Sequence, residues 1–294
     1  MDLSTFAESV GERGPVRIEG DCTRGGAPGD FPLVRAPAGI VEFLPAEMTL
    51  TCGAGTTLAE VDSVLATAGQ MVSLGETGTV GGALGSGWSG VKRLGHGPVR
   101  DALLQCRYVN ADGRVVKAGG PTVKNVSGFD LCRLMVGSRG TLGFLGEVIL
   151  RTRPRPRCST WFVSSEADPV ALLSALYRPA SVLWNGTSVW VCLEGHPDDV
   201  AEQSQRIRGA SEVAGPPPLP TGGRRSVAPR DLRALTGHFV AEMGVGVVHH
   251  ADPASAVSVD PAVRLLHGRI KQCFDPVGRL NPGVDVLSPV GGKP

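Results

Sequence analysis

Seven glycines lie within sixteen positions in Gly75-Glu-Thr-Gly-Thr-Val-Gly-Gly-Ala-Leu-Gly-Ser-Gly-Trp-Ser-Gly90. The backbone N–H groups of such a segment can converge on one concavity and bind a diphosphate without a charged side chain. The alternative is a series of surface turns, which also favour glycine. The density of glycine and the interleaved Ser and Thr hydroxyls favour a phosphate-binding loop. This is not the dinucleotide-binding fingerprint, because no Gly-x-Gly-x-x-Gly opens a helix directly after a strand.

Regular elements are predicted before this loop. Residues 41–44 and 48–52 have the composition of short strands. A helix should begin after Thr57, because Thr57 and Glu60 have the spacing of a capping box. Apolar residues then recur at steps of three and four, and Gly69 stands where a helix should end. The pattern therefore predicts two strands followed by one amphipathic helix.

The region after the loop predicts a hairpin and a buried strand. Residues 103–116 indicate two strands joined around Asp112-Gly113, a dipeptide typical of hairpin turns. A short helix should follow Ser127, which has capping-box spacing with Asp130. Residues 140–150 predict a turn that leads into a buried strand. Short strands thus dominate this half of the chain.

The character of the chain changes at Arg153-Pro-Arg-Pro-Arg157, where each proline removes a backbone donor from any sheet. We place a domain boundary there. The region beyond it predicts a strand at 160–163, a helix capped by Asp168, strands within 181–193, a helix near 198–208, an extended loop at 215–223, a strand at 243–249 and a helix from about Asp260. The four arginines of Arg151–Arg157 indicate either a solvated linker or a contact for an acidic partner subunit.

Composition and charge exclude several classes of function. The 294 residues carry 29 Lys and Arg against 28 Asp and Glu, so the net charge of +1 gives no electrostatic reason to bind nucleic acid. The seven cysteines include no Cys-x-x-Cys pair, which zinc and iron–sulfur sites commonly use. A cluster of that kind would have to belong to a partner.

The sequence also predicts the cellular compartment. Residues 1–8 lack the basic and apolar segments of a secretory signal, and no stretch is long and apolar enough to predict a direct membrane span. Free thiols fit a reducing cytoplasm. We expect a cytoplasmic protein, with any contact to a membrane made peripherally through a complex.

Further motifs occur in a fixed order around the glycine-rich loop. They are Thr79-Val-Gly-Gly82, Ser89-Gly90 with Arg93, Val99-Arg-Asp101, Lys124-Asn-Val-Ser-Gly-Phe-Asp-Leu131, Gly137-Ser-Arg-Gly-Thr-Leu-Gly143 and Ile270-Lys-Gln-Cys-Phe-Asp-Pro-Val-Gly-Arg-Leu-Asn-Pro-Gly283. Their order and spacing resemble the FAD-binding flavoproteins related to vanillyl-alcohol oxidase and para-cresol methylhydroxylase (PCMH). Within that superfamily the chain is most similar to the FAD-binding subunits of glycolate oxidases. The resemblance is dense over about residues 35–155 and 262–285.

The resemblance implies an α+β fold in three parts. A two-part FAD-binding domain of the PCMH type is expected at residues 1–155, and a small ferredoxin-like α+β cap domain at 156–262. The C-terminal segment, 263–294, should return to the FAD-binding domain. The residues that would hold FAD by this resemblance are Gly78, Thr79, Val80, Gly81, Gly82, Ser86, Gly87, Trp88, Arg93, Lys124, Asn125, Gly140, Thr141, Gly143 and Val148, with Val148 near the adenine end. Lys124 either offers positive charge to the flavin or its phosphates, or is simply solvated.

The first phosphate loop departs from the family pattern. It stands here as Arg17-Ile-Glu-Gly-Asp-Cys-Thr-Arg24, where Asp21 and Cys22 replace glycines. An acidic side chain beside a diphosphate should weaken binding unless it points away or Arg24 neutralises it. No histidine precedes His96, and relatives use a histidine of the first loop as a covalent flavin anchor. We therefore expect non-covalent FAD.

The cap region departs from the pattern as well. Relatives that oxidise D-2-hydroxy acids carry a spaced His-rich metal motif, whereas this chain has only His249-His250 followed by Asp252. Adjacent residues on a strand point to opposite faces and do not readily bind one metal ion, so we expect no metal site. His249 is the candidate catalytic base, and the alternative is a histidine at the surface or in a polar core contact. We assign no chemistry to the four other histidines.

The activity implied by the resemblance is oxidation of a small 2-hydroxy acid, with hydride transfer to flavin N5. Electrons would then leave through an iron–sulfur subunit, beside a FAD-linked catalytic paralogue in a hetero-oligomer. The competing hypothesis is a non-catalytic FAD-binding or scaffold subunit of such a complex. A third, the FAD subunit of a molybdenum hydroxylase, shares the fold but should show its own flavin-loop patterns.

Overall fold

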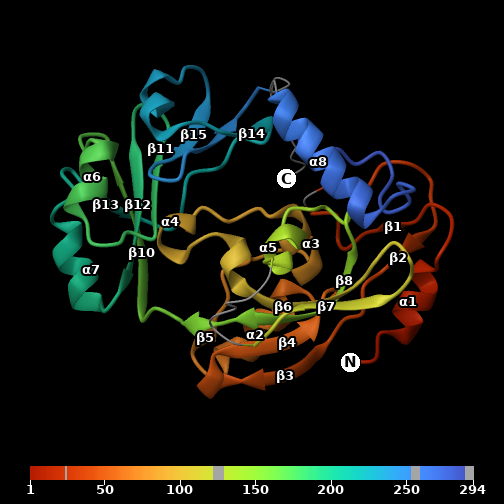
Figure 1. Cartoon of the computed structure of the whole chain (residues 1–294). Helices are drawn as coiled ribbons and strands as arrows, with labels where there is room; N and C mark the ends of the chain where they lie inside the picture. Colours follow the sequence, from red (N-terminus) through yellow and green to blue (C-terminus); the bar gives the residue numbers. More distant parts are fainter. Residues whose placement is uncertain (24, 122–128, 253–258, 289–294) are drawn as a thin grey trace. The chain divides into compact units, whose positions relative to one another are not determined.

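The computed structural model describes residues 1–23, 25–121, 129–252 and 259–288, and the chain divides into two compact units (Figure 1). The first unit contains Met1–Ser89, Pro98–Pro154 and the segment that starts at Ser258. The second contains Gly90–Gly97 and Arg155–Val257. A short excursion of the chain between two segments of the first unit thus belongs to the second.

The first unit is built on a five-stranded antiparallel sheet. Its order is β3 (Ile40–Leu44), β4 (Thr49–Gly53), β8 (Phe144–Arg151), β6 (Leu103–Val109) and β7 (Val115–Gly119). The predicted strands and the hairpin around Asp112-Gly113 are confirmed. Gly113 has φ +72°, as the turn requires.

One helix of this unit follows the prediction closely. α2 (Leu58–Ala66) begins at Thr57, whose hydroxyl accepts a hydrogen bond from the Glu60 N–H at 3.1 Å. It buries Leu58, Val61 and Leu65 against the main hydrophobic core, with β4, β6 and β8 on the other side of that core. The helix ends at Ala66, earlier than the pattern predicts, and Thr67 is its C-cap residue. Gly69 follows in the left-handed conformation, with φ +63°.

One sequence-based expectation for this unit is wrong, and a second is confirmed with a different capping residue. The glycine-rich segment was expected to be a loop, but its middle forms the helix α3 (Val80–Ser86), which Thr79 caps and Gly87 ends with φ +66°. Burial of Val80, Ala83 and Leu84 outweighs the poor helix propensity of its three glycines. The helix expected after Ser127 is α5 (Leu131–Met135), which Asp130 itself caps through the Arg133 N–H, and Ser127 lies outside the described residues.

Smaller elements complete the first unit. They are α1 (Ser4–Val10), the parallel pair β1 (Arg17–Ile18) and β2 (Leu33–Val34), the pair β5 (Gln70–Met71) and β9 (Arg153–Pro154), the 3-10 turns η1 (Pro45–Glu47) and η2 (Val99–Ala102), and α8 (Pro261–Phe274). A second, smaller hydrophobic cluster joins α1, β1 and β2 to Phe144 and Leu280. The sequence did not predict α1.

The second unit begins with a ferredoxin-like βαββαβ segment. Its elements are β10 (Cys158–Ser164), α6 (Pro169–Ala175), β11 (Ser181–Trp184), β12 (Val189–Gly195), α7 (Pro197–Ser204) and β13 (Ser211–Val213). The strands pair antiparallel in the order β13-β10-β12-β11, which is the ferredoxin-like arrangement that was expected. Asp168 caps α6 as predicted, accepting hydrogen bonds from the N–H groups of Val170 and Ala171.

Three more strands extend this sheet beyond β11. They are β15 (Phe239–Glu242), β16 (Val247–His250) and β14 (Gly223–Ser226), and the short elements α4 (Arg93–His96) and η3 (Pro229–Ala234) also belong to this unit. The single strand predicted at 243–249 is wrong. Gly244 and Gly246 have φ +76° and +80°, so the chain turns there and β15 precedes the turn.

The two faces of the second sheet differ. One face packs under α6 and α7, and its buried cluster contains Phe162, Val191 and Val248. The other face carries a smaller cluster, Trp161, Ala180, Leu183, Cys192 and Val240, with Val91 of the excursion packed against it. We call this second side, which α6 and α7 leave uncovered, the helix-free face. Among the residues that the structure describes, no helix is both long and apolar enough to cross a bilayer.

Candidate functional site

A cavity of about 310 Å³ lies within the first unit. Its walls come from five segments that are far apart in sequence: the loop after β1, the end of β2 with its following turn, the residues after β4, α3, and the turn before β8. Asn281 and Val284 of the C-terminal segment line it as well. Glycine supplies much of the lining, so that much of the wall is backbone.

The loop after β1 is the first phosphate loop, whose sequence departs from the family pattern. Its residues 18–23, 25 and 26 form one wall of the cavity. Cys22 has φ +52°, a left-handed conformation that favours glycine, although the residue is cysteine. A methyl group on Gly20 would collide with Oγ1 of Thr79 on the facing wall. The loop therefore keeps the backbone course of a glycine-rich loop despite its substitutions.

The wall made by α3 is held close to β4. The Thr79 hydroxyl accepts a hydrogen bond from the Gly82 N–H at 3.1 Å, and the Gly81 N–H donates to the Ala54 carbonyl at 2.6 Å. A Cβ atom on Gly81 would stand 2.9 Å from that carbonyl oxygen. Only glycine allows this approach without displacing the backbone.

The turn before β8 donates hydrogen bonds to the C-terminal end of α3. The N–H groups of Gly137 and Arg139 donate to the carbonyls of Leu84 and Gly85, each at 2.9 Å. These bonds satisfy acceptors in the last turn of α3, which would otherwise need water. The helix and the turn thus form one continuous wall.

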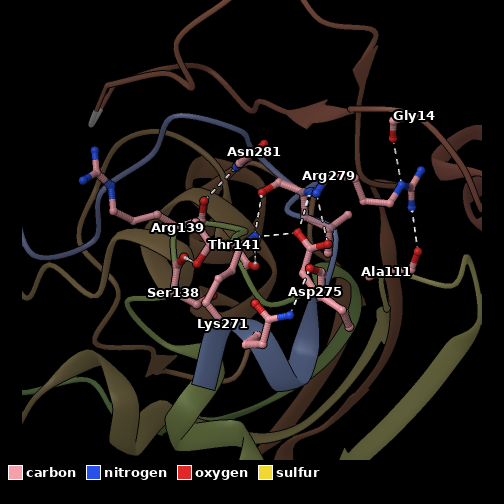
Figure 2. Close-up of polar contacts among 12 residues, drawn as sticks. Gly14, Ala111, Ser138, Arg139, Thr141, Lys271, Asp275, Arg279 and Asn281 are labelled. Atoms are coloured by element: carbon pink, nitrogen blue, oxygen red, sulfur yellow. Dashed lines mark hydrogen bonds and ion pairs between the residues drawn. The ribbon is translucent and has the colours of Figure 1, made fainter. Parts of the chain in front are cut away.

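Asn281 links this turn to the first loop (Figure 2). Its Oδ1 accepts a hydrogen bond from the Ile18 N–H at 2.9 Å, and its Nδ2 donates to the Arg139 carbonyl at 2.7 Å. Its own N–H donates to the Val16 carbonyl at 3.0 Å. One buried side chain therefore sets the separation between two walls of the cavity.

Three charged residues fix the segment that carries Asn281, as Figure 2 shows. The buried Asp275 carboxylate accepts hydrogen bonds from Lys271 Nζ at 2.5 Å, the Arg279 N–H at 3.0 Å and the Leu280 N–H at 2.8 Å. Lys271 Nζ also donates to the Thr141 carbonyl at 2.7 Å. The segment is thereby tied to the turn before β8.

The Arg279 guanidinium is buried and surrounded by backbone carbonyls (Figure 2). It donates to Gly14 at 2.8 Å, Ala111 at 2.9 Å, Gly11 at 3.0 Å and Val10 at 2.6 Å. These carbonyls lie at the end of α1, in the residues after α1 and in those after β6. One side chain thus ties the C-terminal segment both to α1 and to the sheet. We call Lys271, Asp275, Arg279 and Asn281 the C-terminal clamp.

Charges of both signs line the cavity. Arg35 and Arg139 are cationic, and Arg139 remains so although burial lowers its pKa, an effect that Asp285 opposes. Glu19 is neutralised by Arg17 at 2.8 Å, whereas Asp21 is exposed. Among the described residues, the N–H groups of Gly20, Asp21 and Gly140 donate no hydrogen bond. Two arginines and unpaired backbone donors on facing walls suit a phosphate-bearing ligand.

The predicted cofactor residues fall into three groups. Those that line the cavity are Thr79, Gly81, Gly82, Ser86, Gly140 and Gly143. Those placed beside or behind it are Gly78, Val80, Gly87, Trp88, Thr141 and Val148, of which Val80 and Val148 are core residues. Arg93 belongs to the second unit, and Lys124 and Asn125, like Arg24, lie outside the described residues.

The predicted base, His249, lies on β16 with its ring Nε2 2.9 Å from Oε1 of the buried Glu242. His250 points to the opposite face, because the register pairs His249 with Val240 and His250 with Phe239. Burial lowers the pKa of His250, and the positive charge of Arg225 lowers it further. In the part of the chain that the structure describes, no group of three His, Cys, Asp or Glu side chains is placed to hold a metal ion.

A second buried histidine–carboxylate pair lies on the same face of this sheet. His96 Nε2 is 2.6 Å from Glu194 Oε2, and Lys92 Nζ is 2.8 Å from Glu194 Oε1. Burial alone would raise the pKa of Glu194, but hydrogen bonds and charge from His96 and Lys92 lower it to about 2. These contacts tie the excursion Gly90–Gly97 to β12.

Sequence reasoning missed several of these residues. Arg35, Glu242 and Glu194 gave no motif signal, since each meets its partners only through tertiary structure. Arg139 was inside a quoted motif, but without a role of its own. Asn281 and the rest of the clamp were inside a motif that was quoted, but without a role. Asn281 follows Gly278 by three residues, and both have positive φ, +45° and +69°. This Gly-x-x-Asn spacing is the local signal of the turn.

Residues 30–119 match the model of a protein family described as the FAD binding domain. The chain carries this family's FAD-binding domain. The matched segment contains β2, the glycine-rich helix α3 and Arg35, so it covers much of the cavity. The expected α+β fold with a PCMH-type FAD-binding domain is thereby confirmed.

Curated relatives of this chain include glycolate oxidase subunits, D-lactate dehydrogenases and FAD-linked oxidoreductases. It is 34% identical to glycolate oxidase subunit GlcE of Escherichia coli (strain K12) over 72% of its length, which covers 65% of that relative. It is 39% identical to a D-lactate dehydrogenase of Archaeoglobus fulgidus over 37% of its length and 40% identical to glycolate oxidase subunit GlcD of Bacillus subtilis (strain 168) over 26%. These matches cover only 25% and 17% of those two relatives, so the chain spans less than two thirds of each of the three.

Solved structures of alkyldihydroxyacetonephosphate synthase share the fold. One superposes with a TM-score of 0.65 and 14% identity, covering 95% of this chain and 72% of that one. A second crystal form gives a TM-score of 0.67 at 13% identity. At this identity the likeness concerns the fold alone.

Proposed function

We propose that this chain is a FAD-dependent oxidoreductase subunit of the glycolate oxidase type, which oxidises a small 2-hydroxy acid and passes electrons to a partner subunit. The observation that carries the proposal is the similarity to glycolate oxidase subunit GlcE over 72% of this chain. A FAD-linked paralogue and an iron–sulfur subunit are the partners we expect, since the cysteines of this chain show no cluster-binding spacing.

The residues around the cavity fit FAD. A Cβ atom on Gly20, Gly81 or Gly140 would stand less than 3.0 Å from an atom of a neighbouring segment, so these glycines let the walls approach closely, and unpaired N–H groups lie on facing walls. Arg35 and Arg139 would balance the charge of the diphosphate and of Asp21, which also lines the cavity. When bound, FAD would accept a hydride from the carbinol carbon of the substrate.

We propose that FAD is held without a covalent bond. Among the described residues that line the cavity there is no histidine. Cys22 does line it, but partial desolvation and the charge of Glu19 raise the pKa of its thiol, which keeps it in the less reactive thiol form. Precipitation with acid should therefore release all of the flavin into the supernatant.

His249 is the base that we propose for the substrate hydroxyl. Its side chain is 13% exposed, its Nε2 faces Glu242, and its Nδ1 makes no hydrogen bond to a described residue. A neutral imidazole with one free nitrogen can accept a proton near pH 7. A substrate carboxylate would be favoured by the positive charge of Arg224, which the strand register sets beside His249.

The alternative, a non-catalytic FAD-binding subunit, is favoured by Glu19 and Asp21 in the first loop and by the polar contact that already holds His249. Anaerobic mixing of the purified, FAD-loaded chain with short 2-hydroxy acids separates the two. Bleaching of the flavin absorbance at 450 nm supports direct oxidation. Bound flavin that no 2-hydroxy acid bleaches, while dithionite does, favours the relay or scaffold role.

A further inference from the structure

Glu242 is a buried carboxylate that the proposed chemistry has not used. It is 2% exposed, and its Oε1 lies 2.9 Å from Nε2 of His249. Its Oε2 is fully enclosed and has no hydrogen-bond partner among the described residues. A carboxylate in such a place is costly unless it has a task or a partner.

The strand register puts the surrounding groups on the helix-free face. β16 pairs His249 with Val240 of β15 and with Arg224 of β14, and Glu242 is two residues beyond Val240 on the same face. Leu183 of β11, which pairs with Glu242, belongs to the apolar cluster there. Glu242 is thus fixed from both sides by neighbouring strands, and so is the ring that it contacts.

Hydrogen bonding to a carboxylate selects one form of a neutral histidine. An ionised carboxylate only accepts hydrogen bonds, so the ring nitrogen that faces it must carry the proton. That nitrogen is Nε2, and the lone pair is then on Nδ1. In catalytic triads a carboxylate sets the histidine tautomer in this way, and its loss lowers the rate steeply.

We propose that Glu242 is the positioning residue for His249, which it holds as the Nε2–H tautomer so that Nδ1 accepts the substrate hydroxyl proton. The inference rests on the proposed function. In that reaction the O–H proton goes to Nδ1, and the carbinol hydrogen leaves with its bonding electron pair as a hydride that reduces FAD. The products are a 2-oxo acid and an imidazolium, which the Glu242 carboxylate stabilises.

The charged groups around the pair are Arg224 of β14 and Arg93 of α4 on the helix-free face, with His250 and Arg225 on the other. Burial lowers the pKa of Arg224, and the negative charge of Glu242 opposes that change. Arg224 thereby compensates part of the carboxylate charge. It does not replace Glu242 as an acceptor, because a guanidinium only donates hydrogen bonds.

The test reads the tautomer directly in the full-length protein. We would label histidine with ¹⁵N, assign His249 by comparison with His249→Gln, and measure the Nδ1 and Nε2 shifts at pH 8 with and without FAD. The wild type should show protonated Nε2 and unprotonated Nδ1. Glu242→Leu should average the two shifts, and Glu242→Gln, which keeps one acceptor oxygen, should restore most of the difference.

Glu194→Gln is the matched control, because it alters the other histidine–carboxylate pair of the same sheet, and it should leave the His249 signals unchanged. Flavin reduction by a 2-hydroxy acid should slow at least about ten-fold in Glu242→Leu and partly recover in Glu242→Gln. A proton on Nδ1 in the wild type, or one tautomer retained in Glu242→Leu, overturns the proposal. Wild-type protein that shows the Nε2–H tautomer but never reduces FAD overturns the proposed oxidation instead.

Discussion

The two units of this chain build their polar sites from different parts of the polypeptide. In the first unit the cavity walls are backbone, brought together at Gly20, Gly81 and Gly140 and held by the C-terminal clamp. In the second unit the polar groups are side chains, paired as His249–Glu242 and His96–Glu194. A backbone site tolerates no added side-chain volume, whereas a side-chain site depends on charge and protonation. Variants of each kind should therefore affect one unit and spare the other.

The largest effect is expected from Arg279→Leu in the first unit. The substitution keeps apolar bulk but leaves four or more buried carbonyls without their donor, at a cost of about 3–5 kcal/mol. Urea unfolding would be followed by circular dichroism and, in a Trp88→Phe background, by the fluorescence of Trp161, Trp184 and Trp190, which then reports on the second unit alone. The first unit should unfold at lower urea, while those tryptophans change late.

Arg269→Leu is the control for that variant, since Arg269 lies exposed on α8 and should cost less than about 0.5 kcal/mol. Equal losses in the two variants would show that Arg279 is no clamp. A simultaneous early transition of both units in Arg279→Leu would show that the comparison between independent units is wrong.

The next effect concerns cofactor affinity. Gly81→Val puts a branched side chain against the Ala54 carbonyl, which a Cβ atom would already approach to 2.9 Å. Overpacking of this kind costs about 1–3 kcal/mol, which corresponds to about 5- to 150-fold weaker FAD binding. Titration of FAD fluorescence measures it. Gly268→Ala, on α8 with open space around its Cβ, should bind FAD as the wild type does, and equal affinity for all three proteins would contradict a backbone cradle.

The smallest effect is a pH dependence confined to the second unit. Because the folded chain lowers the pKa of Glu194 from an ordinary value of 4.5 to about 2, this pair stabilises the fold above pH 4.5 and ceases to do so as the pH falls toward 2. We expect a loss of about 1–2 kcal/mol across that range, after allowance for screening of Lys92. Urea midpoints from tryptophan fluorescence between pH 2 and 6 measure it.

Glu194→Gln should flatten this profile, because the amide does not titrate, and should already be less stable at pH 6. Glu212→Gln, which removes an exposed carboxylate on β13 of the same unit, serves as the reference. A profile of unchanged steepness in Glu194→Gln would assign the acid sensitivity to other carboxylates.

Features that depend on neighbouring residues could be predicted from the sequence, whereas features that depend on tertiary contacts could not. Thr57 with Glu60, and Asp168 with Pro169, are local signals, and the helices that they predict are present. The ferredoxin-like order of β10 to β13 followed from the family resemblance and is confirmed. The helix α3 was missed because tertiary burial of Val80 and Leu84 outweighs the propensity of glycine, which a local pattern does not record.

In the candidate site, the glycines of the cavity walls could be predicted from the sequence, and the glutamates paired with histidines could not. Gly81, Gly82 and Gly140 stood out because close approach of the backbone requires glycine in the sequence itself. Glu242 and Glu194 did not stand out, since each is an ordinary strand residue whose partner comes from another strand or from the excursion. The turn between β15 and β16 had a signal in Gly244 and Gly246, which the prediction of one strand overlooked.

The measurement that most directly tests whether the first unit is a flavin site is the visible absorption spectrum of the purified chain, taken before and after acid precipitation. We predict a flavin band near 450 nm with about one FAD per chain, all of it recovered in the supernatant. A chain that stays colourless even after incubation with excess FAD, while folded by circular dichroism, would contradict the account. Flavin retained in the pellet would contradict non-covalent binding.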